Sequence, residues 1–320
     1  MTTQITKDIN IAATALQSGK VVAIPTETVY GLAGIIYNQE AIKDIYRIKK
    51  RPLENPLIVH THSAEIFPEI AVDIPEAAYK LAEAFWPGPL TILLKKNTVI
   101  PDNVTSGLDT VAVRVPSHPV TISLLRELKQ PVAAPSANPF GRISPTSARH
   151  VLDYFDGRIS CILDGGACSV GIESTIVGFE DGIPVVYRQG AVTAAQIKDV
   201  TGNVTVKTAS TNTPKAPGMY PRHYSPRTPL VVTDNIKQAL ADFQGLNTVV
   251  IGYSKLCRDL VAEKKIILPE SGNFEEAAAK LYGTLHYADS INTDIIIAER
   301  FPDRGLGSAI NDRLTRASKK

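Results

Sequence analysis

The sequence predicts an α/β protein with a large sheet-centred domain, flanked by helices, and a smaller α/β domain after it. Three observations lead to this fold class. The chain has 320 residues, more than one compact core usually holds, although length alone leaves a single large domain possible. Short apolar runs alternate with helical patterns over most of the chain. A proline-rich stretch separates two regions of this alternation.

The first region predicts a sheet covered by helices, and we expect it to form a domain over residues 1–207. Apolar runs that predict strands are VVAIP, LIVH, LTILLKK, TVAVRVP, VAAP, CILDGG, STIVGF and PVVYR. Between them, EAIKDIYRIKK and PEAAYKLAEAF have helical spacing. In the first of these helices, Ile42, Ile45, Tyr46 and Ile48 fall on one side, which would pack on the sheet.

Residues 208–229 predict a linker, because prolines in this stretch forbid a regular helix or a central strand. These prolines are Pro214, Pro217, Pro221, Pro226 and Pro229. Beyond them, the β/α alternation resumes in PLVV, NIKQALADF, TVVIGY, KKIILPE, FEEAAAKLYGTLHYADSI and DIIIAE. Residues 230–320 therefore predict a smaller domain with a Rossmann-like arrangement.

Composition and charge exclude several classes of protein. Hydrophobic residues make up 44% and charged residues 21%, which is ordinary for a globular protein, and no apolar stretch is long enough to cross a bilayer. A net charge of +2 is far from that of a dedicated nucleic-acid binder. The amino terminus lacks the features of a signal peptide, so we expect a cytoplasmic protein. Cys161, Cys168 and Cys257 have no metal-site spacing, which favours buried or free thiols.

The familiar phosphate-binding and catalytic motifs are missing. Neither a Walker loop nor a GxGxxG pattern occurs, and GxSxG, HExxH and paired Cys/His spacings are also absent from the sequence. A nucleotide site would therefore have to be built from side chains on several loops. In open α/β sheets ligands bind beyond the carboxyl ends of strands, so the segments that follow predicted strands are the ones to inspect.

The first such segment follows VVAIP and contains two threonine hydroxyls, a carboxylate and a tyrosine between residues 26 and 32. A turn whose threonines cap a helix explains it equally well. The second segment, which precedes the strand LIVH, carries Lys49 and Arg51 in a loop stiffened by Pro52 and Pro56. Cations often cap a helix C-terminus, but a point charge beside a planar fork also suits a polyphosphate. His60 ends LIVH, where a structural histidine is the ordinary interpretation.

The third segment is the strand that ends at Arg114, whose alternation places Val111, Val113 and Val115 on one face and Thr110, Ala112 and Arg114 on the other. An arginine on such a face suits a carboxylate, although an exposed edge strand has the same pattern. The fourth segment holds Ser136 and Asn138 between prolines, where they either bind phosphate or ribose or form an Asx or Ser turn. Weaker candidates are the stretch 171–175 and Arg188.

In order and spacing, these segments together resemble the YrdC-like family of threonylcarbamoyl-AMP synthases. The shared features are PTETVYGL, the K-x-R of Lys49 and Arg51 with its RPxxNP, the S-x-N of Ser136 and Asn138, and GIESTIV. APGMYPRHYSP is similar to the linker of the long, two-domain members, and GLGSAINDRL to the closing motif of their second domain. The resemblance covers nearly the whole chain and implies a YrdC-like twisted mixed sheet followed by the Rossmann-like domain.

The resemblance implies an enzyme that makes L-threonylcarbamoyl-adenylate from L-threonine, bicarbonate or carbon dioxide, and ATP, with release of pyrophosphate. The product would pass to a tRNA threonylcarbamoyl transferase. Adenylation needs positioning and charge neutralisation, so the cations together with Mg²⁺ should matter more than a covalent nucleophile. We find no acidic pair for Mg²⁺, so phosphates and water would hold it; Glu27 and Glu173 are weak candidates for ligands.

Matching positions imply two sets of binding residues. The ATP set is Lys49, Arg51, Asn55, Thr110, Ser136, Asn138, Ser144, Arg188 and Tyr224, of which Lys49, Arg51, Ser136 and Asn138 form the catalytic core. The L-threonine set is Thr28, His60, Arg114, Ala134 and Ser174, with Arg114 on the substrate carboxylate. The linker, through Tyr220, Arg222, His223 and Tyr224, would close over the nucleotide as a lid.

Two alternatives remain open from sequence. YrdC-like domains also occur in carbamoyltransferases that handle carbamoyl-adenylate, but those are much larger and carry zinc-finger segments that this sequence lacks. A double-stranded RNA-binding module is the second alternative, and the near-neutral charge counts against it as the main role.

Overall fold

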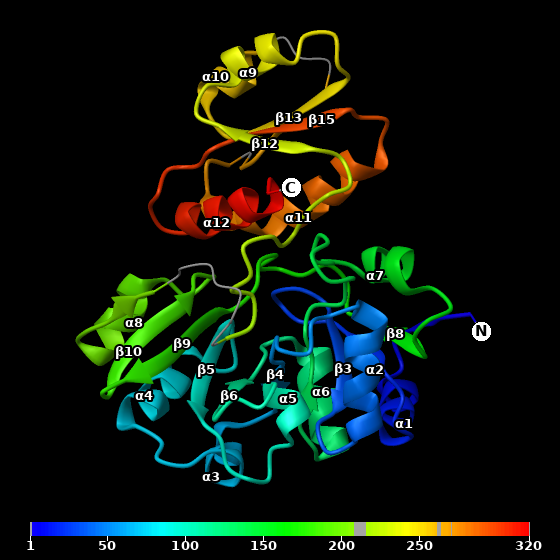
Figure 1. Cartoon of the computed structure of the whole chain (residues 1–320), viewed down its shortest axis with the longest axis vertical. Helices are drawn as coiled ribbons and strands as arrows, with labels where there is room; N and C mark the ends of the chain where they lie inside the picture. Colours follow the sequence, from blue (N-terminus) through cyan, green and yellow to red (C-terminus); the bar gives the residue numbers. More distant parts are fainter. Residues whose placement is uncertain (1, 208–215, 261–263, 270, 320) are drawn as a thin grey trace.

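The computed structural model describes residues 2–207, 216–260, 264–269 and 271–319. The described chain forms an eleven-stranded mixed sheet and a separate four-stranded sheet, stacked along the long axis of the molecule (Figure 1). The large sheet has the order β1-β8-β2-β3-β7-β4-β6-β5-β9-β10-β11, and the last of these strands ends at Val206. The predicted fold class, a mixed α/β domain followed by a smaller α/β domain, is confirmed.

The strands of the large sheet include every one predicted from an apolar run. They are β1 (Gln4–Thr6), β2 (Val22–Ile24), β3 (Gly31–Ile35), β4 (Ile58–His60), β5 (Leu90–Lys95), β6 (Thr110–Arg114), β7 (Val132–Ala133), β8 (Cys161–Leu163), β9 (Thr175–Glu180), β10 (Ile183–Arg188) and β11 (Thr205–Val206). Strand β3 was not predicted, because the segment that follows VVAIP was interpreted as a turn. Gly34 explains part of it: a Cβ at this position would lie 3.2–3.3 Å from side-chain atoms of α2, so the strand needs a glycine to pack closely.

Helices cover this sheet. They are α1 (Ile9–Gln17), α2 (Gln39–Lys49), α3 (Phe67–Ile70), α4 (Glu76–Phe85), α5 (Asp102–Thr105), α6 (Pro119–Leu128), α7 (Ala148–Phe155) and α8 (Ala194–Thr201), with a short 3-10 turn at Ala64–Ile66. The two helices predicted from spacing are α2 and α4. Helix α2 starts at the cap Asn38 and stops because Lys50 adopts a left-handed conformation with φ 52°. That turn sends Arg51 out of the helix and into the loop that follows.

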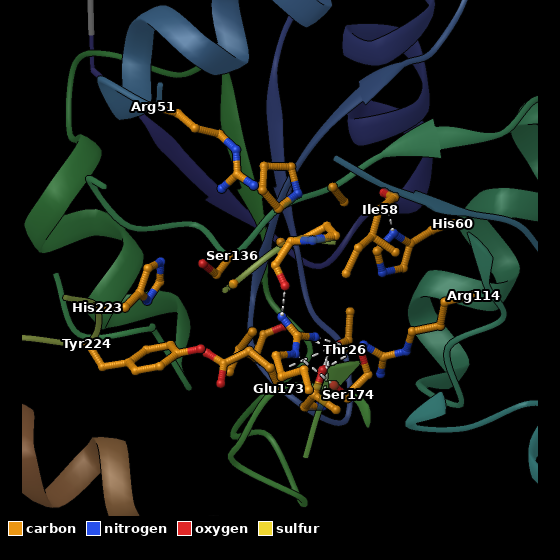
Figure 2. A pocket seen from close by; sticks show the side chains of 18 residues that line it. Thr26, Arg51, Ile58, His60, Arg114, Ser136, Glu173, Ser174, His223 and Tyr224 are labelled. Atoms are coloured by element: carbon orange, nitrogen blue, oxygen red, sulfur yellow. Dashed lines mark hydrogen bonds between the residues drawn. The ribbon is translucent and has the colours of Figure 1, made fainter. Parts of the chain in front are cut away.

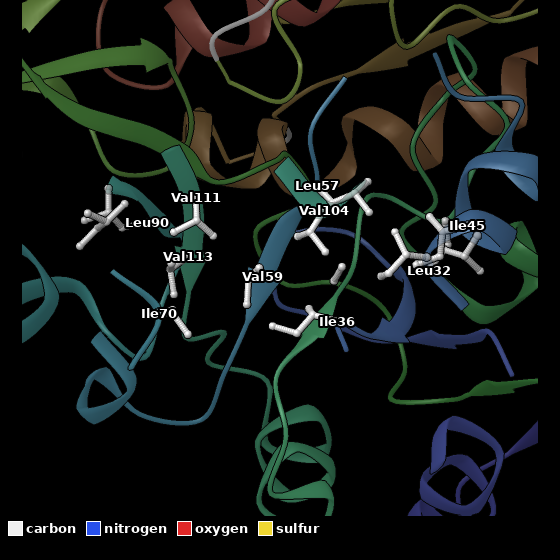
Figure 3. Close-up of a cluster of buried hydrophobic side chains, with 14 of the residues drawn as sticks. Leu32, Ile36, Ile45, Leu57, Val59, Ile70, Leu90, Val104, Val111 and Val113 are labelled. Atoms are coloured by element: carbon white, nitrogen blue, oxygen red, sulfur yellow. The ribbon is translucent and has the colours of Figure 1, made fainter. Parts of the chain in front are cut away.

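The main core lies on one face of the sheet. Val59, Val111 and Val113 are buried there together with Ile45 of α2, as Figure 3 shows. The alternation predicted for β6 is therefore confirmed, but the alternative of an exposed edge strand is not, because β6 pairs with β4 on one side and β5 on the other. Burial of a valine or isoleucine side chain of this kind contributes about 1.5–3 kcal/mol to stability.

The opposite face of the sheet is also covered, and the linker contributes to the cover. Ala216 and Met219 pack against Ile58 and Ala112 in a second apolar cluster. Residues 208–215 of the predicted linker lie outside the described residues, whereas 216–229 are described. The linker thus reaches back over the sheet before it enters the second domain.

The second domain is an all-parallel sheet with the order β12-β15-β13-β14 and helices on both faces. Its elements are β12 (Leu230–Thr233), α9 (Ile236–Asp242), β13 (Thr248–Gly252), α10 (Lys255–Asp259), β14 (Lys265–Ile267), α11 (Phe274–Ser290), β15 (Ile295–Glu299) and α12 (Gly307–Ala317). Helices α11 and α12, orange and red in Figure 1, lie on the face that meets the first domain. Their apolar side chains share a core with Val29, Ile143 and Ile172 of that domain.

Two smaller predictions concern the whole chain. Cys161, Cys168 and Cys257 are buried, unpaired thiols, as expected. Across the described ranges, none of the helices combines the length and apolar character needed to cross a membrane.

Candidate active site

A cavity lies at the edge of the large sheet where several strands end. Strands β4, β6 and β10 end there with His60, Arg114 and Arg188, and β9 begins there just after Ser174 (Figure 2). Strand β9 runs antiparallel to β10 and parallel to β5, which is itself antiparallel to β6. The amino end of β9 therefore lies at the same edge of the sheet as the carboxyl ends of β4, β6 and β10. The mixed sheet therefore gathers loops from distant parts of the sequence around one space, as ligand sites in α/β proteins require.

The structure brings the whole predicted threonine set to this cavity. Lining residues from that set are Thr28, His60, Arg114, Ala134 and Ser174. Thr28 and Ser174 present hydroxyls that are already hydrogen-bonded: Thr28 to Thr26 at 2.8 Å, and Ser174 to Thr91 at 2.7 Å. The hydroxyls of Thr28 and Ser174 are therefore held in fixed orientations, as a selective pocket requires.

Arg114 is buried and held on three sides. Its Nε donates to the carbonyl of Gly88 at 3.1 Å, its Nη1 to the Thr28 hydroxyl at 2.9 Å, and its Nη2 pairs with Glu27 at 2.7 Å. The Glu27 carboxylate also accepts the backbone N–H of Ser117. Glu27 is therefore an internal partner of the predicted carboxylate clamp, a role that the sequence did not suggest.

His60 is a buried, neutral histidine. Burial, together with the nearby Arg114 cation, lowers the pKa of His60 from its usual 6.5 to about 3. Its Nδ1 lies 3.1 Å from the carbonyl of Ile58, which can only accept, so Nδ1 carries the hydrogen and Nε2 is left as an acceptor. His60 can thus hydrogen-bond a ligand but is too weak a base to take up a proton at neutral pH.

The predicted ATP set divides into three groups. Arg51, Ser136, Arg188 and Tyr224 line the cavity. Lys49, Asn55, Asn138 and Ser144 are buried next to these residues and hydrogen-bond to the loops that form the lining, without lining it themselves. Thr110 forms the third group, because the structure does not bring it to the cavity.

Thr110 begins β6, whereas Arg114 ends it, and a strand rises about 3.3 Å per residue. Thr110 pairs with Lys95 and lines a different depression with Asp73 and Asp109 on the far side of the sheet edge. The placement of Thr110 with the ATP ligands is thus not supported by its position. The alternation in β6 placed Thr110 on the same face of the strand as Arg114. It could not show that the cavity lies at the carboxyl end of β6, where Arg114 is, rather than at the end where Thr110 is.

Lys49 holds the Ser136–Asn138 loop rather than facing open space. Its Nζ donates to the backbone carbonyls of Ser136 and Asn138, both at 2.5 Å. Burial, with a smaller contribution from the Arg51 cation, lowers the pKa of Lys49 well below its usual value. The Asn138 amide in turn donates to the carbonyls of Pro139 and Arg142. The two predicted motifs, K-x-R and S-x-N, are therefore in direct contact.

Arg51 is oriented by its own loop. Its Nε and Nη2 donate to the carbonyl and side-chain oxygens of Asn55 at 2.9 and 2.7 Å, and Nη2 also donates to the carbonyl of Pro56. Burial lowers the pKa of Arg51 to about 10, so it stays charged at neutral pH. Asn55, which the resemblance assigned to ATP, serves as the acceptor that aims this guanidinium.

Arg188 is the third arginine of the lining, after Arg51 and Arg114. Its Nε and Nη2 donate to the carbonyl and hydroxyl of Ser174, both at 3.0 Å, and its Nη1 lies 3.4 Å from the carbonyl of Pro217. It thus links the amino-acid side of the cavity to the linker. Gly218 lies against it, since a Cβ there would come within 2.9 Å of Nη1.

The linker forms one wall of the cavity through Pro217, Gly218, His223 and Tyr224. Tyr224 has a left-handed backbone with φ 67° and is buried. Burial lowers the pKa of His223 to about 3, and its Nδ1 has no hydrogen-bond partner within the described part of the chain. Of the other predicted lid residues, Tyr220 packs edge-on against Phe140, and Arg222 is exposed.

Glu27 and Glu173, the two carboxylates near the cavity, are both engaged in ion pairs. Glu27 is paired with Arg114, and Glu173 with Arg313. No group of three His, Cys, Asp or Glu side chains that could hold a metal ion occurs among the residues that the structure describes. The two weak Mg²⁺ candidates from sequence thus each have an arginine as a direct partner.

Several lining residues were not assigned to a substrate from sequence: Thr26, Val29, Gly31, Ile58, Pro135, Pro217 and Gly218. Most of them flank a predicted residue and contribute backbone or apolar surface, for which a sequence carries no signal. Glu173 was named only within the weak candidate stretch 171–175 and as a possible metal ligand, whereas its side chain lines the cavity next to Ser174.

Comparisons with known proteins cover the whole chain. A family model described as "Telomere recombination" matches residues 14–190, and one described as "Threonylcarbamoyl-AMP synthase, C-terminal domain" matches residues 192–319. The threonylcarbamoyl-AMP synthase of Pyrococcus abyssi is 41% identical over 97% of this chain and 94% of its own length. That of Bacillus subtilis is 40% identical over 96% of this chain and 92% of its own length.

Solved structures lead to the same family as the sequence comparisons. The structure of P. abyssi Sua5 complexed with L-threonine has a TM-score of 0.91 to this chain at 41% identity, covering 97% of this chain and 94% of that one. The comparisons favour neither the carbamoyltransferase nor the RNA-binding module. With both parts of the chain matched and relatives similar over almost their full length, the chain belongs to the threonylcarbamoyl-AMP synthase family.

Proposed function

We propose that this cavity is where the synthase joins L-threonine, carbon dioxide or bicarbonate, and ATP into L-threonylcarbamoyl-adenylate, with pyrophosphate as the second product. One observation carries this assignment. Residues expected to bind the amino acid and residues expected to bind the nucleotide line a single cavity, although they come from loops far apart in the sequence. The L-threonine complex of P. abyssi Sua5 adds support for the amino-acid side.

L-threonine would bind at the end of the cavity formed by Arg114, Thr28 and Ser174. The Arg114 guanidinium is the fixed cation there, and its Glu27 partner keeps it in place for the substrate carboxylate. The hydroxyls of Thr28 and Ser174, which their own hydrogen bonds hold in place, would each still have a lone pair to accept the hydrogen of the threonine hydroxyl, a bond that valine cannot make.

The nucleotide would bind where Arg51 and Arg188 meet the Ser136 loop. The threonine amine adds to carbon dioxide and loses one proton, which forms a carbamate. A carbamate oxygen then bonds to the α-phosphorus of ATP, and the bond from that phosphorus to the bridging oxygen breaks, so pyrophosphate leaves. No lining residue is required as a covalent nucleophile; the two arginines supply positive charge around the reacting phosphates.

The linker would open and close over this site. The cavity volume is about 50 Å³, whereas ligand pockets usually measure about 300–1,000 Å³. The site would therefore have to widen to hold ATP, and we propose that the wall formed by residues 217–224 is the part that moves. This movement is the lid predicted from the aromatic and basic residues of the linker.

Several further parts of the proposal concern partners. Mg²⁺ would enter as the ion bound to ATP, since the carboxylates near the cavity are paired with arginines. Bicarbonate is proposed as the carbon source, and a tRNA threonylcarbamoyl transferase as the enzyme that consumes the product, in the cytoplasm. A direct RNA contact stays a prediction; binding to duplex RNA that weakens steeply with salt would support it.

The decisive experiment incubates the pure protein with Mg²⁺, ATP, bicarbonate and single amino acids, and measures pyrophosphate. We expect release that depends on threonine and is lost in Lys49→Ala and Arg51→Ala. Pyrophosphate release that is equal without threonine, or absent with it, would refute the proposal.

A further inference from the structure

Glu173 lines the cavity, yet much of what holds it comes from the other domain. Its carboxylate accepts the Ser144 hydroxyl at 2.6 Å, the Tyr282 hydroxyl at 2.8 Å and the Nε of Arg313 at 3.0 Å. Tyr282 belongs to α11 and Arg313 to α12, both in the second domain. All four side chains are buried, so this cluster is a polar junction between the domains directly behind the site.

Arg313 also contacts the linker wall. Its side chain has no exposed surface, its Nη1 pairs with Asp312 at 2.9 Å, and its guanidinium lies over the ring of Tyr224, 5.4 Å from the ring centre. Tyr224 lines the cavity from the linker side. A single side chain of the second domain therefore touches both a wall residue, Glu173, and a lid residue, Tyr224.

Glu173 carries a charge that needs this partner. Burial alone would raise the pKa of Glu173, but Arg313, Arg188 and the Ser144 hydrogen bond together lower it to about 2. The carboxylate is therefore ionised at neutral pH, beside the space proposed for a polyphosphate. An anion there would repel the nucleotide unless a cation neutralises it.

Arg188 is the other cation close enough to influence Glu173. It is held in place by the Ser174 carbonyl and hydroxyl, which also fixes Ser174 for the amino acid. Without Arg313, the uncompensated carboxylate would attract Arg188 away from Ser174. Both substrate subsites would then lose their geometry.

We propose that Arg313 is a positioning residue of the active site: by neutralising Glu173 and supporting Tyr224, it keeps Arg188 and the closed linker in place for the reaction. The second domain thus completes the site of the first. This inference rests on the proposed function, because its assay is threonine-dependent pyrophosphate release.

The test is a double-mutant cycle on the full-length chain with Glu173→Gln, Arg313→Met and the two combined. We expect R313M to lower kcat/KM for ATP about 100-fold, because a misplaced wall disturbs the reacting geometry. We expect the combined variant to be about 10-fold more active than R313M, because the unpaired charge is gone. The kcat/KM of R313K for ATP should lie between those of R313M and the wild type, because lysine restores the positive charge but not the planar guanidinium.

Arg142→Met is the matched control. Arg142 forms another ion pair between the domains, with Asp289 at 3.1 Å, and does not line the cavity. We expect its kcat/KM to stay within about fivefold of the wild type. Thermal unfolding of every variant separates loss of activity from loss of folded protein. If R313M does not fold, R313K is compared with the wild type by itself, and unchanged kcat/KM for ATP in R313K would then refute the inference.

Three results would overturn the inference: wild-type kcat/KM in a folded R313M, an equal loss in R142M and R313M, or a combined variant no more active than R313M. Failure of the proposed function is a different result. In that case the wild type itself shows no threonine-dependent pyrophosphate release.

Discussion

Substitution of Lys49 by methionine tests how the two sequence motifs work together. Methionine fills nearly the same volume but cannot donate to the carbonyls of Ser136 and Asn138, which lie 2.5 Å from the lysine Nζ. Lys49 is only 1% exposed, so water cannot replace the lost donor without a rearrangement. The Ser136–Asn138 loop should therefore shift, although the helix that carries residue 49 stays intact.

The effect on stability should be moderate. Two lost hydrogen bonds cost about 1–2 kcal/mol each. Part of this is returned, because burial lowers the pKa of Lys49 and so makes its ammonium costly to keep inside the protein. We expect a net loss of about 1–3 kcal/mol, which for a chain of 320 residues corresponds to a melting temperature lower by about 2–5 °C.

The effect on activity should be larger. A displacement of about 1 Å in a positioning loop can cost a factor of about 100, or about 2.7 kcal/mol in activation free energy. We therefore expect kcat/KM for ATP to fall about 100-fold in a protein that is still folded. The assay is threonine-dependent pyrophosphate release at a temperature well below the melting point.

Lys43→Met is the control, because it makes the same substitution in the same helix. Lys43 pairs with Glu40 at 2.7 Å, but the two side chains are 62% and 79% exposed. It should change stability by less than about 0.5 kcal/mol and leave kcat/KM unchanged. The reasoning fails if folded K49M retains wild-type kcat/KM, or if K43M loses as much as K49M.

Other predictions test further parts of the structure. Arg114→Lys keeps the charge but loses the fork, so KM for threonine should rise about tenfold while KM for ATP stays constant; equal changes in both would contradict the assignment. Gly171→Ala should lower the melting temperature, because φ is +74° and the new Cβ would lie 2.5 Å from the backbone of Ala279 in α11. Gly202→Ala is the control, because φ is +81° but nothing lies within 4 Å of the new Cβ. A smaller fall in melting temperature in this variant would show that part of the loss in Gly171→Ala comes from the clash rather than from backbone strain. Burial lowers the pKa of His286 from 6.5 to about 3, so between these pH values the unfolded chain binds a proton that the folded chain does not. Stability should therefore fall as the pH drops from 7 towards 4, and less steeply in His286→Gln, by thermal unfolding at each pH; equal slopes would refute the assignment.

Much of the fold could be predicted because apolar periodicity reports burial directly. The alternation in β6 placed Val111 and Val113 on the core face, and the structure buries both. Strand β3 was missed because its glycines and small residues lack a strong strand pattern, and its role depends on close packing against α2. Likewise, the sequence could not show that Ala112 of β6 packs under Ala216 and Met219 of the linker, because those residues come about 100 positions later in the chain.

By itself, the sequence determined which loops surround the cavity, since polar groups after apolar strands and the family resemblance pointed to the same loops. Only the tertiary structure decided what each one does. It showed Lys49 bonded to backbone carbonyls, Thr110 at the opposite end of β6 from Arg114, and Glu173 held by Arg313 of the second domain. The physical reason is that a side chain's partners, its burial and therefore its charge depend on segments far away in the chain, which local pattern does not encode.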